Sequence, residues 1–486
     1  MSRGVGLEPD PATRRSWLAE ATTLVEDRRR ARIASDSASR GRPVIHEVPL
    51  ASGMQGALSH VVAAAENALD TTSSGYMAYI PGGGLFATAI ADLVSDVLNR
   101  YTGLAEAAPE LWRLERDVLR WLSTSFGYDE DAEGLFTSGG SLATFAAVAA
   151  ARDAAVLAGG DDLRRLAGYT SAEAHASVSG AFRLAGLPVG NLRHVSTDSC
   201  FRLRSDHLKE LVATDRANNL VPFIIIATAG TTNTGAIDPL GEIARISRDE
   251  KLWMHTDAAY GGAFVLCPEG RQRLAGIEQS HSITLDPHKG LFLPYGTGCL
   301  LFRSAALLPQ TRSEHAPYLH DLQATAGNPG RRPADFQLEL TRPFRGLRLW
   351  LPLVVHGAGA FRDALEEKLA LAKMLSQRLE GLAAEGYPIE IVTTPQLSIV
   401  PFRLCRRPGE LIESWNARNR DFLRLINGSG RTILSSTLLP SPAGDVFTLR
   451  ACILSHRTHA KDVENCFEDI RPAADSRGER RSESRP

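Results

Sequence analysis

The sequence predicts an α/β protein with a large domain, in which a mostly parallel, mixed sheet lies between helices, and a smaller C-terminal α+β domain. Three observations support this fold class. With 486 residues, the chain is too long for one simple core. Between residues 140 and 305, short apolar runs alternate with helical segments, which is typical of a sheet covered by helices on both faces. Beyond residue 345, a strongly helical stretch precedes a mixture of short strands and helices.

These patterns divide the chain into four segments. Residues 11–33 predict a helix whose apolar stripe is thin among many charges, so we expect it to pack on another subunit; an exposed helix on the same chain is the alternative. The last residues lack apolar content, which favours disorder. The predicted segments are an N-terminal helical segment (1–80), a large domain (81–345), a small C-terminal domain (346–471) and a tail (472–486).

The large domain is predicted to begin with helices and to continue with strands. Residues 83–125 have helical periodicity, first in the apolar set Leu93, Val94, Val97 and Leu98. The run 282–285 predicts a short buried strand, which must end at Pro287 because proline donates no backbone hydrogen bond. Further strands are predicted within 223–230, 252–259 and 298–303, and just before residue 138.

The composition is that of an ordinary globular protein and argues against several classes of function. A net charge of −2 provides no electrostatic footprint for nucleic acid. The six cysteines lie far apart without a CxxC pair, which indicates thiols in a reducing compartment and no structural zinc. No secretory signal and no run of about 18 apolar residues is found. We therefore expect a cytoplasmic protein with no membrane segment and no metal.

Two stretches combine strand ends with groups that bind ions. Ser138-Gly-Gly-Ser141 opens an alanine-rich helix, and free N–H groups at such a start bind anions such as phosphate; a helix cap without a ligand is the alternative. The stretch lacks the P-loop and dinucleotide glycine patterns. Asp257 ends an apolar run, where a desolvated carboxylate needs a positive partner. It either caps a helix or forms a salt bridge within the protein, or it faces a ligand cation such as a protonated ring nitrogen.

Two more stretches place polar groups near strand ends, and a third holds a histidine. Thr231, Thr232 and neighbouring residues offer hydroxyls and an amide that bind a polar ligand or form a turn. His175 precedes an amphipathic helix, where a histidine is more often structural than a ligand contact. Lys289 follows the strand that Pro287 ends, either as a solvated lysine or as an amine beside a cofactor.

Together these groups predict one ligand. Ligands of open α/β sheets bind beyond the carboxyl ends of the strands, where four of these stretches lie. An anion cradle, a buried acid, an imidazole ring and a lysine complement the phosphate, the pyridinium nitrogen, the flat ring and the aldehyde of pyridoxal 5′-phosphate.

The motifs also resemble a known family. "HTDAAYGG" (255–262), followed by "DPHKG" (286–290), is similar to the group II pyridoxal-phosphate decarboxylases, which include the aromatic-amino-acid, glutamate and tyrosine decarboxylases. The resemblance covers about residues 45–470. It implies the fold type I of pyridoxal-phosphate-dependent transferases, decarboxylation of an L-amino acid to its amine, and a homodimer whose sites both subunits complete.

The resemblance also implies roles for single residues. Lys289 would hold the cofactor as a Schiff base, Asp257 would pair with the pyridine nitrogen, and His175 would stack on the ring; these three are the predicted catalytic residues. Tyr79 and Tyr101 match positions that border the substrate pocket. The predicted cofactor-binding residues are Gly140, Ser141, His175, Thr232, Asp257, Ala259, His288 and Lys289.

Two departures from the family concern the product and the substrate. Residues 321–340 hold no tyrosine to protonate the product carbon, and Phe336 is their only aromatic residue. Either His288, His320 or Tyr318 supplies the proton, or oxygen intervenes and an aldehyde forms. Gly290 stands where the animal and plant aromatic enzymes have tryptophan, which removes bulk beside the lysine and weakens the expectation of dopa or tryptophan as substrate.

The substrate and two rival functions stay open at this point. Arg342, Arg345 and Arg348, at three-residue spacing, form either a solvated surface cluster or, if one points inward, a site for an acidic side chain. An amino acid tethered to a carrier protein is a further alternative. An aminotransferase of the same fold is the rival enzyme, and a non-catalytic binding protein is the rival class that Lys289 argues against.

Overall fold

The large domain is built on a seven-stranded mixed sheet. The computed structural model describes residues 12, 15–16, 18–20, 22–23, 53–66, 68–159, 162–308 and 333–475. Strand β8 runs antiparallel to both of its neighbours, and all other pairs are parallel, which confirms the predicted mostly parallel sheet. In sheet order the strands are β2 (Glu133–Thr137), β8 (Gly298–Phe302), β7 (Ser282–Leu285), β6 (Trp253–Asp257), β5 (Val221–Thr228), β3 (Leu166–Ser171) and β4 (Leu192–Val195).

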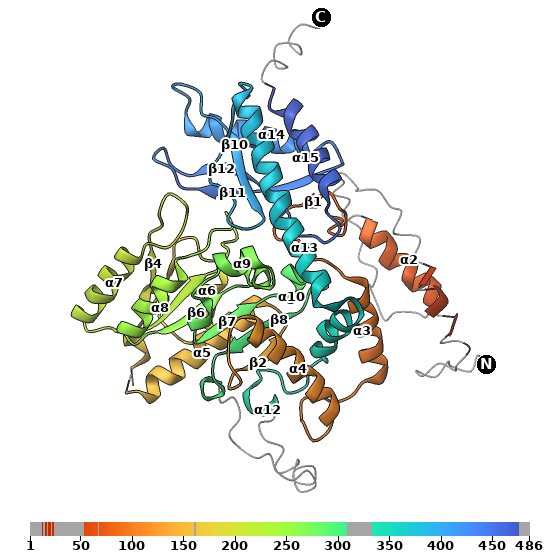
Figure 1. Ribbon diagram of the computed structural model, residues 1–486, viewed down its shortest axis with the longest axis vertical. Coiled ribbons are helices and arrows are strands. Elements are labelled where there is room, and N and C mark those ends of the chain that lie inside the picture. The colour runs from red at the N-terminus through yellow and green to blue at the C-terminus, as the bar shows by residue number, and fades with distance from the viewer. Residues whose placement is uncertain are drawn as a thin grey trace, which may run out of the picture.

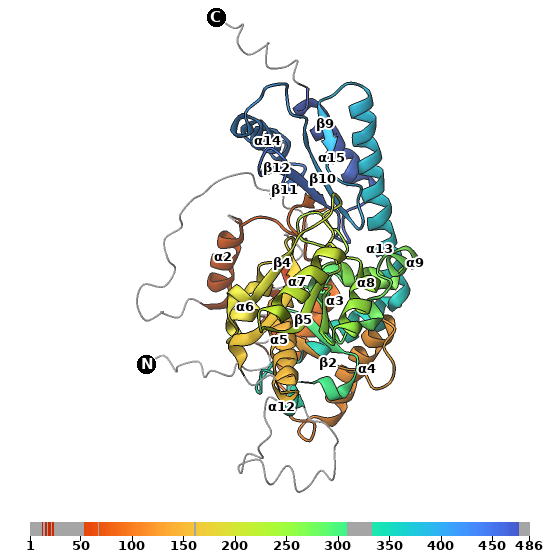
Figure 2. The same ribbon diagram turned by 90° about the vertical axis from the view of Figure 1, so that its left-hand side faces the viewer.

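Helices cover both faces of this sheet (Figures 1 and 2). Side chains alternate along β5, so that Ile224 and Ile226 pack with one set of helices and Ile225 with the other. One face carries α5 (Gly140–Leu157) and α6 (Ser177–Leu184); the other carries α4 (Pro109–Ser125), α7 (Ser205–Ala217) and α8 (Leu240–Asp249). Helix α5 has the length and apolarity of a membrane span, but its buried alanines pack on the sheet as a core helix.

The small domain has a second sheet of five strands. Its order is β1-β11-β12-β10-β9, antiparallel except where β1 pairs in parallel with β11. Because β1 lies within the predicted N-terminal segment, that segment contributes a strand to the C-terminal sheet. The elements are β1 (Tyr76–Met77), β9 (Ile389–Ile391), β10 (Ile399–Leu404), β11 (Ile433–Leu439), β12 (Val446–Cys452), α14 (Ile412–Asn427) and α15 (Ala460–Ala473).

One long helix connects the two domains. Helix α13 (Arg345–Ala384) packs at its start against α3 (Phe86–Leu98) and α4, and at its end against β9, β10 and α15 (Figure 1). Its path bends at Gly357, whose φ of 74° is left-handed, five residues after Pro352. The two helical segments on either side of Gly357 therefore connect the small domain to the large domain.

The predicted N-terminal helix and the predicted loop 321–337 are described only in part. Helical backbone is described within 12–23, but most of that predicted helix lies outside the described residues. Helix α2 (Gly53–Glu66) stands apart from the sheets and buries none of its residues (Figure 2). Tyr318, His320 and most of 321–337 also lie outside the described residues. The exception is α12 (Pro333–Phe336), where Phe336 is buried against Trp112.

Candidate active site

The carboxyl ends of five strands meet at one edge of the large sheet. Strands β2 and β7 are both antiparallel to β8, so they point the same way as β3, β5 and β6. A cavity of about 380 Å³ lies at this edge, and its lining includes all eight predicted cofactor-binding residues. The structure thus brings them together, while the role of each residue stays a prediction.

Lys289 reaches this cavity from a single helical turn after β7. Pro287 ends the strand and opens α10 (Pro287–Gly290), where its missing N–H costs nothing. The Lys289 Nζ lies 2.9 Å from Oδ2 of Asp286. Asp286 is only 3% exposed, and no role was predicted for it although it lies in the DPHKG motif. Its position directly after a predicted buried strand is the feature of the sequence that could have indicated a buried carboxylate.

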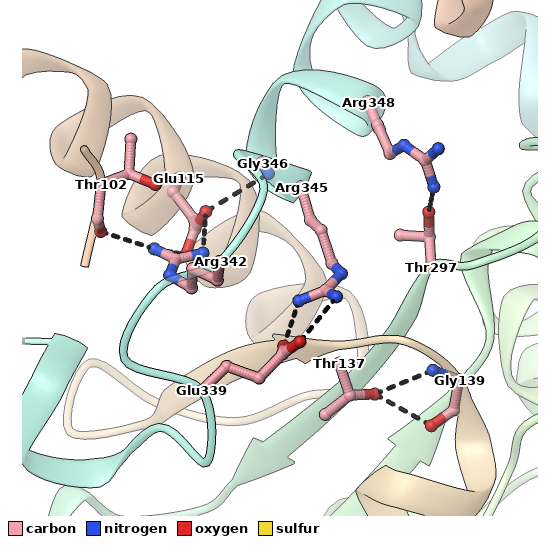
Figure 3. Close-up of polar contacts among 10 residues, drawn as sticks. All are labelled: Thr102, Glu115, Thr137, Gly139, Thr297, Glu339, Arg342, Arg345, Gly346 and Arg348. Carbon is pink, nitrogen blue, oxygen red and sulfur yellow. Dashed lines mark hydrogen bonds and ion pairs between the residues drawn. The ribbon is translucent and has the colours of Figure 1, made fainter. Parts of the chain in front are cut away.

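The start of α5 forms the anion cradle. Thr137 Oγ1 donates to the carbonyl of Gly139 at 2.9 Å and accepts from its N–H at 3.3 Å, which shapes the turn before the helix (Figure 3). The first N–H groups of a helix have no intrahelical acceptor, so they point at a ligand. A Cβ at Gly140 would lie 2.9 Å from Oδ2 of Asp286, so only glycine fits here.

Asp257 presents a carboxylate to the cavity. The side chain is 8% exposed and accepts from the N–H of Ala259 at 3.1 Å. Across the part of the chain that the structure describes, no cation pairs with it. His255, two residues earlier, is buried against Ser282 and Thr284, and this burial lowers its pKa to about 4. The free face of Asp257 therefore suits a cationic ring nitrogen.

Two histidines in the cavity have defined proton positions. His175 Nδ1 accepts from the N–H of Ser177 at 3.1 Å, so the proton of the neutral ring is at Nε2. His288 Nδ1 donates to the carbonyl of Thr297 at 2.7 Å, so its Nε2 carries a lone pair. Burial lowers the pKa of His288, with the nearby carboxylate of Asp286 as a smaller opposing influence. His288 is thus a neutral acceptor at Nε2.

Arg450 on β12 builds the wall between the domains, and sequence reasoning missed it. The guanidinium donates to the carbonyls of Thr232 and, at 2.8 Å, of Asn233. It also donates to the carbonyl of Tyr79 at 3.3 Å and to Ser435 Oγ at 2.9 Å. The sequence indicates this residue only as an arginine within the apolar run of β12, and its burial is seen in the structure.

Tyr79 and Tyr101 do not belong to the lining of the cavity. Tyr79 is 63% exposed, and its backbone has a left-handed φ of 53°. A Ser435 hydroxyl that accepts from the Tyr79 N–H at 2.9 Å, together with Arg450, holds this strained conformation. The substrate contacts of both tyrosines remain a prediction.

The arginine prediction was wrong in both of its forms. Arg342 precedes α13 and forms a fully buried ion pair with Glu115 at 2.8 Å. Arg345 pairs with Glu339 (Figure 3), and Arg348 pairs with Asp92 at 2.6 Å. None of the three is a solvated cation or lines the cavity, because carboxylates from other elements neutralise each one. Arg348 also donates to Thr297 Oγ1 at 2.8 Å, which fixes the residue that holds His288.

The interpretation of Gly290 also changes. A Cβ at this position would lie 2.5 Å from Cβ of Ala263, because α10 packs tightly on the turn 261–266. Gly290 does not line the cavity. Its missing side chain is therefore a packing requirement and does not enlarge the substrate pocket.

The residues present fit pyridoxal 5′-phosphate. The start of α5 supplies N–H donors for a phosphate, Asp257 supplies a carboxylate without a cation, and Lys289 supplies an amine at the same cavity. At the same cavity, the buried Oδ1 of Asp286 makes no hydrogen bond with any described residue.

Comparisons with known proteins agree with this chemistry. The pyridoxal-dependent decarboxylase conserved domain matches residues 65–405. An aromatic-L-amino-acid decarboxylase of Bacillus atrophaeus is 32% identical over 402 residues, 82% of this chain and 81% of the relative. A phenylacetaldehyde synthase of Arabidopsis thaliana is 29% identical over 411 residues, 83% and 82% of the two chains. The crystal structure of Oryza sativa TDC with PLP and tryptamine matches with a TM-score of 0.84 at 25% identity, over 96% of this chain and 98% of that one. The chain belongs to the pyridoxal-dependent decarboxylase family and is a pyridoxal-phosphate-dependent amino acid decarboxylase.

Proposed function

We propose that the protein decarboxylates a free aromatic L-amino acid and works as a homodimer. The observation that carries the choice of substrate is the charge of the cavity. Lys289 is the one cation among the described residues that line the cavity, and Asp286 already neutralises it. Arg450 is buried behind the backbone of Thr232, with donors directed at carbonyls. An acidic side chain would therefore lack a partner, whereas an aromatic one needs none.

The names of the relatives support the same substrate class. They include an aromatic-L-amino-acid decarboxylase of Bacillus atrophaeus and a tryptophan decarboxylase of Oryza sativa. Neither the cavity lining nor these names suggests a carrier-bound substrate.

The proposed roles follow from the positions of the side chains. Pyridoxal phosphate, when bound, supplies the electron sink that lets the α-carboxylate leave as CO₂. Lys289 Nζ binds the cofactor aldehyde, and the first turn of α5 holds the phosphate. Asp257 keeps the ring nitrogen protonated, because an opposite charge at short range favours the charged form. His175, with its proton at Nε2, lines the same cavity and orients the ring.

A second candidate product is the aldehyde, and a specific observation favours it. After CO₂ leaves, Cα must receive a proton for the amine to form. Neutral His288 has its only N–H engaged by Thr297, Phe336 is buried, and residues 321–340 contain no tyrosine. If O₂ reacts first, the amino acid, O₂ and water give the aldehyde, CO₂, ammonia and hydrogen peroxide. Phenylacetaldehyde synthase is the name of one relative.

A panel of amino acids tests the substrate and the product together. Phenylalanine, tyrosine, tryptophan, aspartate and glutamate are each incubated with the holoenzyme, and CO₂, amine, aldehyde and peroxide are measured. We expect CO₂ from the aromatic substrates, with equal amounts of amine or, for the second candidate, of aldehyde and peroxide. Faster turnover of aspartate or glutamate would contradict the proposal. A keto acid without CO₂ would indicate an aminotransferase.

The homodimer is proposed from an exposed apolar face. The apolar periodic set of α3 is not buried in the chain: Val97 is 76% exposed, and Leu93, Val94 and Leu98 are also exposed. Val354 and Val355 of α13, which packs against α3, are exposed as well. Exposed apolar side chains gathered on packed helices mark an interaction site, and a second copy would bury them.

Sedimentation tests the homodimer with two matched substitutions. Val97→Glu places a charge on the apolar face and should shift the protein to monomer. Leu157→Glu changes a still more exposed residue at the end of α5 and should leave the dimer intact. A natural protein that sediments as a monomer at micromolar concentration would refute the assembly.

A further inference from the structure

Asp286 is a buried carboxylate for which the decarboxylation reaction has no use. Its Oδ2 lies 2.9 Å from Nζ of Lys289 and 3.8 Å from Nε2 of His288. Its Oδ1 is buried and makes no hydrogen bond with any described residue. The carboxylate is therefore neutralised by a single group, which is the amine that must bind the cofactor.

The same carboxylate lies against the phosphate cradle. Oδ2 would be only 2.9 Å from a Cβ built on Gly140, the first residue of α5. The backbone keeps it there, because the Asp286 N–H donates to the carbonyl of Ala259 at 3.2 Å and its carbonyl accepts from the Lys289 N–H at 2.8 Å. These two bonds fix the main chain of Asp286 at the turn between β7 and α10.

We propose that Asp286 is a counter-ion brake on cofactor capture: it engages Nζ of Lys289 in an ion pair and puts a negative charge beside the phosphate cradle. The paired Nζ is not free to attack an aldehyde until this 2.9 Å contact breaks. A like charge in a buried place opposes the arriving phosphate. Capture therefore begins by breaking the Lys289–Asp286 ion pair. This inference rests on the identity of the cofactor and not on the substrate proposed above.

The chemistry of capture shows where the brake acts. The ammonium first loses a proton, and the free amine then attacks the aldehyde carbon. One C=N bond forms, the C=O bond breaks, and the oxygen leaves as water. In total, two of the three ammonium protons leave with the oxygen and one is on the nitrogen of the product, so no oxidant or reductant is needed. A carboxylate paired with Nζ slows the first of these steps, because Nζ must leave the ion pair before it can react.

Stopped-flow absorbance of cofactor binding to the cofactor-free protein tests the brake without any turnover. Asp286→Asn keeps the shape and an oxygen acceptor for Nζ but removes the charge, so capture of pyridoxal 5′-phosphate should be about tenfold faster. Pyridoxal, which has no phosphate, should gain less, because only the amine is released. Asp286→Glu keeps the charge and should keep the slow rate.

The outcomes separate charge from shape. Capture that is unchanged or slower in Asp286→Asn would overturn the proposal and make Asp286 a base that activates the lysine. Fast capture by Asp286→Glu would also overturn it. Equal gains for the two aldehydes would remove the phosphate half of the proposal. Asp215→Asn, which alters a buried acid paired with Arg193 at the other edge of the sheet, controls for lost stability and should capture at the natural rate.

Discussion

Asp257 and Asp286 are two buried carboxylates at the ends of neighbouring parallel strands, but their partners differ. Asp257 ends β6 opposite Thr284 of β7, and Asp286 follows β7 directly. Asp286 faces the ammonium of Lys289, whereas no described cation faces Asp257. The carboxylate that the chain leaves unpaired is the one placed for a cationic ligand atom, and the paired one controls the amine.

Lys289→Ala should have the largest effect, because it removes the cation that distinguishes Asp286 from Asp257. Without Nζ, no covalent link to the cofactor forms, so turnover and the visible absorbance of the bound cofactor should both disappear. Asp286 also loses its only cation, while Asp257 keeps its surroundings. Lys373→Ala, on the exposed side of α13, is the matched control and should behave like the natural protein. Turnover that persists in Lys289→Ala would refute the assignment.

Asp257→Ala tests the other carboxylate. Loss of a charge aimed at the reacting system typically costs about 10²–10³-fold in rate, and we expect a loss at the upper end of that range. Asp257→Asn should be nearly as slow, because an amide does not hold the ring nitrogen protonated. Single-turnover CO₂ release measures both variants. If Asp286→Asn were as slow as Asp257→Asn, the two carboxylates would not have the distinct roles assigned to them.

Arg342→Ala compares a purely structural buried ion pair with that of Asp286. It leaves Glu115 charged, buried and without its cation, which should lower the free energy of unfolding by about 3–5 kcal/mol. On the same helix as Glu115, the exposed pair Arg113–Glu110 is the control, and Arg113→Ala should cost at most ~1 kcal/mol. Urea unfolding measures both. Equal losses would mean that burial does not distinguish these pairs.

The strands of the site were predictable from the sequence because they are apolar and end at proline, glycine or an acid. Strands β6, β7 and β8 lie within their predicted ranges, and β5 begins two residues before its predicted range of 223–230. Strands β3 and β4 were not predicted: β3 has small and polar residues, and β4 is four residues long with Arg193 and His194 inside it.

Residues of the site whose partners lie far along the chain escaped prediction. Arg450 binds the carbonyl of Thr232 across 218 positions, and Arg342 meets Glu115 across 227. Local spacing contains no information about such pairs. Asp286 escaped for another reason, since the motif pointed to its neighbours and only the fold shows that its carboxylate turns back to Lys289.

The smallest expected effect is the change in unfolding free energy with pH. It bears on the comparison through His255, two residues before Asp257 on the same strand. Burial lowers the pKa of His255, His281 and His456 to about 4 from an ordinary value near 6.5. Between these values the unfolded chain binds more protons than the folded one, so stability is complete above about pH 6.5 and falls as the pH drops toward 4. At pH 5.5 each histidine should cost about 1 kcal/mol of unfolding free energy relative to pH 7.5.

Urea unfolding of His255→Gln at the two pH values isolates the contribution of His255 to this loss of unfolding free energy. This variant should lose about 1 kcal/mol less on acidification than the natural protein, whereas His194→Gln, an exposed position on β4, should lose the same amount as the natural protein. An unchanged pH dependence in His255→Gln would mean that this imidazole is already protonated in the folded state. In that case a cation would lie on the strand of Asp257, and the contrast between the two carboxylates would no longer hold.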